Sequence, residues 1–191
     1  VKRDVVRIIT PGTKLEESFL VQKENNILMA LLFFDNIWAS CWIDISTGLF
    51  KSTVSNKTNL LSLIDQISPI ETISYANKKE LSILKSYTHI EITWLESKKN
   101  FSRDILIDYL SSFFDPERLQ KLNTGLLGSI SLLVEYLKKN KNLFLDHFDI
   151  PEQVELSNIM TIDPSTRKNL EINTSLDGEK NLSLLGVVDK T

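Results

Sequence analysis

The stretch NILMALLFFDNIWASCWIDISTGLFKSTV, residues 26–54, decides the fold of this chain. It holds three apolar or β-branched runs, residues 27–34, 38–44 and 49–54, and such runs are typical of strands. Asp35-Asn36 separates the first two runs and Thr47-Gly48 the second and third, and both pairs are turn signals. Strands joined by connections this short pair as antiparallel neighbours. The stretch therefore predicts a three-stranded antiparallel meander.

The pattern on either side of the meander extends it into a layered α/β domain. A β-branched strand is predicted before it, at residues 5–10. After it, helical spacing over residues 60–67 is followed by a strand at 71–75, a helix at 77–87 and a strand at 89–94. The order βββ-α-β-α-β predicts a mixed sheet flanked by helices, as in an RNase H-like fold.

Helices dominate the next part of the chain. A helix capped by Ser102 or Asn100 is predicted, because its apolar residues follow one stripe: Ile105, Leu106, Tyr109, Leu110 and Phe113. Asp115-Pro116 predicts the start of a short helix. Residues 125–139 predict the strongest helix, and its small residues near the start allow close packing on a neighbour.

The C-terminal part differs in pattern. Residues 142–155 show no period and predict an extended crossing segment, and a boundary between two parts of the chain is expected at about residues 142–156. Asp163-Pro164 predicts a helix running to about Ser175, and a further element is expected to begin near residue 181. We expect two units: residues 1–150, and residues 151–191 as the start of a second domain that continues beyond the last residue.

Composition bounds the functions that are open to the chain. Apolar residues make up 42% and charged residues 25%, which is typical of a soluble globular protein. The net charge is −3, and residues 1–150 carry equal numbers of basic and acidic residues, which disfavours a protein that mainly grips phosphate backbones. Cys41 is the single cysteine, so no intrachain disulfide forms and a cytoplasmic location is expected. No apolar run is long enough for a membrane span.

Enzymatic chemistry finds little support in the residues. The fold class includes nucleases that hold two metal ions with carboxylates, so Asp35 and Glu71 are the acids to test for that alternative. Asp44 is expected to cap the turn that follows it. The glycines form no phosphate-binding loop, and no serine elbow is present. Cys41 is expected in the core, and His89 and His147 stand far apart. We therefore expect no catalytic, cofactor-binding or metal residue.

Five phrases, in order, resemble the MutS family of DNA mismatch repair proteins. They are VVRIITPGT (5–13), NN (25–26) before an apolar strand, WIDISTGLF (42–50), MTIDPSTRKNLEI (160–172) and SLLGVVDKT (183–191). The resemblance implies an RNase H-like connector domain followed by the first segment of the core, or lever, domain. It also implies that the mismatch-reading motif, and the ATPase with its ATP and Mg, belong to other parts of a longer protein. That longer protein would be a homodimer that binds mismatched DNA, with no membrane association.

In this family the connector is expected to present a surface to the partner protein MutL. The polar side of the helix over residues 102–113 is our candidate, through Asp104, Asp108 and Ser111, which follow helical spacing. An ordinary solvated helix face is the alternative explanation of the same three residues.

Overall fold

The structure, a computed structural model, describes residues 26–75, 92–95, 102–139, 149–156, 162, 164–172 and 175–188. The predicted strand at 5–10, the predicted helix at 77–87, and both histidines lie outside these residues. Of the predicted strand at 89–94, the last three residues are described and are a strand.

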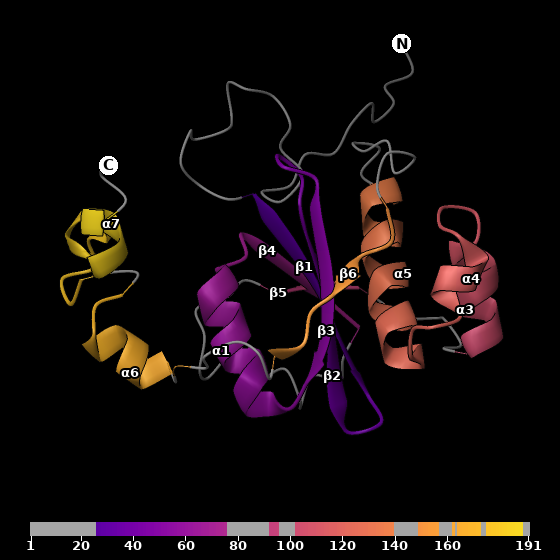
Figure 1. The fold of residues 1–191 in the computed structure, drawn as a ribbon, viewed down its shortest axis with the longest axis horizontal. Coiled ribbons are helices and arrows are strands. Elements are labelled where there is room, and N and C mark those ends of the chain that lie inside the picture. The colour runs from indigo at the N-terminus through magenta and orange to yellow at the C-terminus, as the bar shows by residue number, and fades with distance from the viewer. Residues whose placement is uncertain are drawn as a thin grey trace, which may run out of the picture.

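Among the described residues, a mixed sheet of six strands forms the centre of the molecule (Figure 1). Its strands are β1 (Ile27–Phe34), β2 (Ile37–Asp44), β3 (Leu49–Ser55), β4 (Glu71–Ser74), β5 (Ile92–Trp94) and β6 (Glu152–Gln153). The spatial order is β5-β4-β1-β2-β3-β6. The first three strands pair antiparallel, so the predicted meander is confirmed. β4 runs parallel to β1, β5 parallel to β4, and β6 parallel to β3.

Turn chemistry holds the meander in register. Asp35 and Asn36 have φ of 48° and 62°, the left-handed pair that a two-residue hairpin turn requires. At the second turn, the carboxylate of Asp44 accepts bonds from the backbone N–H of Ser46 at 2.9 Å and from its hydroxyl at 2.6 Å. The capping role predicted for Asp44 is confirmed.

Helices cover both faces of the sheet, because successive side chains on a strand point to opposite sides. Helix α1 (Lys57–Ile67) packs on one face, with Met29, Trp38 and Trp42 beneath it. It is capped by Asn56, whose side chain accepts from the N–H of Asn59 at 2.9 Å, and it ends before Ser68, which is left-handed.

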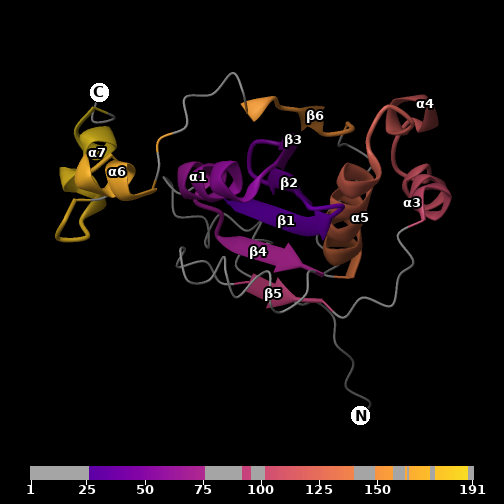
Figure 2. The same ribbon diagram turned by 90° about the horizontal axis from the view of Figure 1, so that it is seen from below.

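Helix α5 (Thr124–Lys139) packs on the other face. Leu28 and Cys41 lie beneath it, and Cys41 is fully buried, as predicted for a core residue. A Cβ added at Gly125 would meet the Cβ of Ala39 at 3.2 Å, so the start of α5 approaches β2 as closely as a glycine allows. Two short helices, α3 (Arg103–Leu110) and α4 (Pro116–Leu119), lie outside α5 (Figure 2).

The C-terminal elements lie at the end of the molecule opposite α3 and α4 (Figure 1). They are α6 (Pro164–Asn169), a 3₁₀ turn η4 (Lys180–Leu182) and α7 (Leu184–Val188). The prediction of a helix to about Ser175 was wrong, because α6 ends at Asn169. Glu171 is left-handed at φ 50°, and its carbonyl and that of the next residue accept N–H groups from the start of α7 instead of continuing α6.

Candidate protein-docking surface

Helix α3 is held against the domain by one narrow apolar side. Leu106 and Leu110 are buried in the cluster formed with α5, while Ile107 and Tyr109 are partly buried beside them. The helix begins after Ser102, as predicted, but that side chain makes no capping bond. Asp104 lies in the first turn, where a carboxylate favours the positive end of the helix dipole. The solvent-facing side of α3 is therefore presented by a firmly packed helix.

An arginine fixes the start of α3 to the turn after α4. The guanidinium of Arg103 donates to the carbonyl oxygens of Leu122 and Gln120, each at 2.7 Å. A planar guanidinium with two such bonds is held in one orientation. The side chain of Arg103 therefore links α3 to α4, in addition to the backbone that connects them.

The three predicted docking residues do not all lie free on α3. Asp104 and Asp108 are exposed and, at i and i+4, share one face. Ser111 is half-buried at the C-cap of α3, and its hydroxyl donates to the carbonyl of Ile107 at 2.7 Å. The structure thus places the two carboxylates on one face of α3, whereas the hydroxyl of Ser111 is bound to the backbone of its own helix.

Ile105 is a surface residue that the sequence pattern missed. We expected it in the apolar stripe, but its side chain is 54% exposed. The buried side of α3 is centred on Leu106 and Leu110, and Ile105 lies at the far edge of that stripe, next to Asp104. The sequence did hold one signal that a residue at the edge of the stripe would be exposed: five apolar positions in nine residues make a stripe wider than α3 buries. We call Asp104, Ile105 and Asp108 the α3 surface.

One cation and two aromatic rings meet where the end of α3 faces α5. The ammonium of Lys138 lies 4.8 Å from the ring centre of Phe113 and 5.9 Å from that of Tyr109. Such a contact stabilises by about 0.5–1 kcal/mol at an exposed site. Burial, and then the nearby negative charge of Glu135, raise the pKa of the Tyr109 phenol.

A second tyrosine ties the sheet to the same end of α5. The phenol of Tyr75 donates to a carboxylate oxygen of Glu135 at 2.8 Å, and Lys139 pairs with the other oxygen at 3.2 Å. Burial first, and then this bond to Glu135, raise the pKa of the Tyr75 phenol above its ordinary range.

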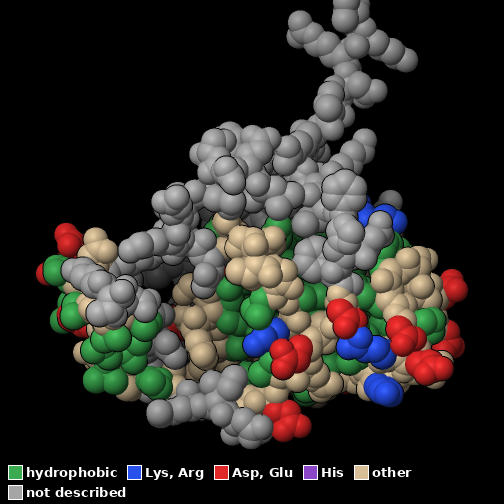
Figure 3. Space-filling view, turned by 45° about the horizontal axis from the view of Figure 1, so that its top comes forward, with side chains coloured by type: hydrophobic (Ala, Val, Ile, Leu, Met, Phe, Trp, Pro, Cys, Tyr) green, Lys and Arg blue, Asp and Glu red, His purple; other side chains and the backbone are tan. Residues whose placement is uncertain are grey.

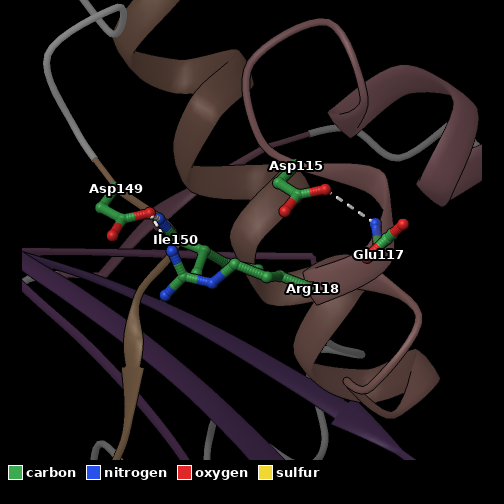
Figure 4. Close-up of polar contacts among 5 residues, drawn as sticks. All are labelled: Asp115, Glu117, Arg118, Asp149 and Ile150. Atoms are coloured by element: carbon green, nitrogen blue, oxygen red, sulfur yellow. Dashed lines mark hydrogen bonds and ion pairs between the residues drawn. The ribbon is translucent and has the colours of Figure 1, made fainter.

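On helix α4, Asp115 accepts from the N–H of Glu117 at 3.0 Å, with Pro116 at the first helical position, so the predicted cap is confirmed (Figure 4). Arg118 donates to the carboxylate of Asp149. This bond raises the pKa of Arg118 and, together with the N–H of Ile150, lowers the pKa of Asp149. Acidic side chains gather at this end of the molecule in Figure 3.

The carboxylates tested for a metal nuclease do not converge. Glu71 pairs with Leu28 at the start of β1, whereas Asp35 follows the last residue of β1. Seven residues of strand separate the two positions along β1, which is roughly 23 Å. Glu71 is also 6% exposed and accepts hydrogen bonds from Tyr136 and from Thr93. These two acids therefore cannot share a metal ion, and within the described part of the chain no group of three metal-binding side chains occurs.

Among the residues described, none of the helices combines the length and apolar character that crossing a membrane requires.

The topology defines the class. A three-strand meander, extended by two parallel strands beside β1 and covered by helices on both faces, is an RNase H-like domain.

The family model for MutS domain II matches residues 26–149. Three relatives named DNA mismatch repair protein MutS align with the whole chain. The protein from Wolbachia pipientis wMel is 32% identical over 203 residues, 23% of its length. Those from Clostridium botulinum (strain 657 / Type Ba4) and Ehrlichia chaffeensis (strain ATCC CRL-10679 / Arkansas) are 34% and 31% identical, over 21% and 24% of their lengths.

This chain belongs to the MutS family of DNA mismatch repair proteins and contains its domain II. It spans about a quarter or less of the length of these relatives. The family assignment confirms the resemblance carried by the five phrases.

Proposed function

We propose that this chain is the connector of a longer MutS-type protein. In that role it links a mismatch-binding domain to the core and ATPase parts, takes no part in catalysis itself, and offers the α3 surface to a MutL-type partner. The whole-chain similarity to mismatch repair proteins supports the connecting role. The binding of mismatched DNA, of ATP with Mg, and the formation of a homodimer are proposed for the longer protein, and we assign none of them to a residue here. A cytoplasmic location is proposed with them.

We propose that the boundary between the two units lies where the chain makes its last contacts with the sheet. The sequence pattern alone puts the division between residues 150 and 151. The pairing of β6 with β3 and the burial of Leu156 favour a boundary a few residues later.

The composition of the α3 surface carries the docking proposal. Protein interfaces combine a desolvated apolar centre with a polar rim. Ile105 is exposed to one side of the two exposed carboxylates, on a helix that Arg103 and the packing against α5 hold in place. A partner with basic groups around an apolar depression would fit this arrangement.

The test is titration of the chain with the N-terminal domain of the MutL-type protein from the same organism, by calorimetry and NMR. Asp108→Arg should weaken binding at least about tenfold, because like charges across an interface are strongly unfavourable. Ile105→Ala should weaken binding with little effect on stability, because the side chain is largely exposed.

The matched control is Asp177→Arg, which changes the net charge equally at an exposed position in the segment between α6 and α7, two helices that lie at the other end of the molecule (Figure 1). Its affinity should equal that of the unchanged chain, and all variants should keep the same circular dichroism spectrum. Equal affinities for Asp108→Arg and Asp177→Arg would remove α3 as the docking site. No saturable binding by the unchanged chain would remove docking as a property of this piece and leave the connecting role.

A further inference from the structure

Residues 149–156 cross the edge of the sheet from one face to the other, and we call them the strap. Ile150 is buried in the cluster beneath α5, whereas Leu156 is buried in the cluster beneath α1. Between them, β6 lies beside β3 at the edge of the sheet (Figure 2). The strap is therefore anchored in both apolar layers, one anchor at each end.

A small number of specific bonds hold the middle of the strap to β3. The N–H of Val154 donates to the carbonyl of Ser52 at 2.8 Å. The hydroxyl of Thr53, which is almost fully buried, donates to the carbonyl of Val154 at 2.6 Å. The ammonium of Lys51 lies 3.9 Å from the carboxylate of Glu152, which is an exposed and weak contact. Of these two side-chain contacts, the buried bond of Thr53 contributes more to holding the strap on β3.

The first residue of the strap is bound to α4. The carboxylate of Asp149 accepts from Arg118 and also from the N–H of Ile150, the latter at 2.8 Å (Figure 4). α4 is in turn linked to the start of α3 through the bonds of Arg103. A continuous set of polar contacts therefore runs from α3 through α4 to the strap.

We infer that the strap opens and closes on β3 as one unit, and that α4 controls this equilibrium through the contact of Arg118 with Asp149. The strap suits such a role because β6 pairs over only two residues, so opening breaks few hydrogen bonds, while the burial of Ile150, Pro151 and Leu156 keeps the closed form dominant. Its exposed residues, Glu152, Gln153 and Glu155, add little to hold it closed.

A consequence for docking rests on the proposed function. The chain leaves the sheet through the strap towards α6, so the strap joins the part that bears the α3 surface to the part that follows. A partner bound on α3 that alters α4 would then shift the strap, and thermodynamic linkage requires the reverse effect as well.

Amide hydrogen exchange on the free 191-residue chain, followed by NMR, tests the strap without any partner. Thr53→Val keeps the shape of the side chain and removes the hydroxyl, so exchange at the Val154 amide should rise by about two- to tenfold. Arg118→Gln should speed exchange at the same amide by at most about fivefold at low salt, because an exposed ion pair is weak. In 1 M salt the Arg118→Gln effect should disappear while the Thr53→Val effect remains.

The matched control is Lys121→Gln, which removes an exposed cation from the turn after α4 and should leave exchange at Val154 unchanged. Faster exchange at Val154 in Thr53→Val but not in Arg118→Gln would overturn control by α4. No change in either variant would overturn the opening unit itself.

Adding the MutL-type domain should change exchange at Val154 in the unchanged chain but not in Asp108→Arg. A partner that binds α3 without that change would overturn the coupling, and one that does not bind would overturn only the proposed docking.

Discussion

The buried hydrogen bond between Tyr136 and Glu71 should contribute strongly to stability. Both side chains are 6% exposed, and the phenol of Tyr136, on α5, donates to the carboxylate of Glu71 at the start of β4. Tyr136→Phe keeps the ring and its apolar burial, so the loss comes from the bond to a charged acceptor. Such bonds contribute about 1.5–3 kcal/mol.

We therefore expect Tyr136→Phe to lower the free energy of unfolding by about 2 kcal/mol in urea titrations at pH 7. For a chain of this size, that corresponds to a fall in the melting temperature of roughly 4–8 °C. Glu71→Gln and the double variant complete a thermodynamic cycle, which isolates the coupling between the two side chains. A loss under about 0.5 kcal/mol, or a coupling near zero, would refute the claim that this bond holds α5 to β4.

Three further outcomes are expected. Gly125→Val should destabilise by about 2 kcal/mol in urea unfolding, since its Cβ would already meet that of Ala39 at 3.2 Å before the two methyl groups are added; an unchanged midpoint would contradict the close packing. Asp44→Ala removes two side-chain bonds at the turn after β2 and should cost about 1 kcal/mol in a thermal melt; no loss would mean that the turn needs no cap. The pKa of Tyr75 is raised by burial and by its bond to Glu135, so its stabilising contribution is complete below the unfolded pKa of about 10 and declines as the pH rises from there towards the raised folded value. The free energy of unfolding should fall less between pH 8 and pH 11 for Tyr75→Phe than for the unchanged chain. An equal fall in both proteins would reject this account.

Local chemistry made the meander and several boundaries predictable. Asp35-Asn36 can adopt the left-handed pair of angles that a two-residue hairpin needs, and Asp115-Pro116 supplies both a cap and a first helical residue. These preferences act over two to four residues, so they are visible in the sequence before any folding is considered.

The candidate docking site was only partly predictable. Helical spacing placed Asp104 and Asp108 on one face correctly, because that face depends on helix geometry alone. Whether Ile105 is buried depends on which side of α3 meets α5, and whether Ser111 is free depends on where the helix ends. Neither follows from the spacing.

The sequence by itself determined the alternating and helical patterns, the turn residues and the five phrases that identify the family. Only the tertiary structure decided that α6 stops at Asn169, that the predicted crossing segment pairs with β3, and that Arg118 meets Asp149. The reason is physical: each of these features depends on a partner distant in the chain, such as the N–H groups of α7 for the carbonyls after α6, or the hydroxyl of Thr53 for the strap. Contacts between segments far apart in sequence become fixed only when the sheet and its helices have assembled.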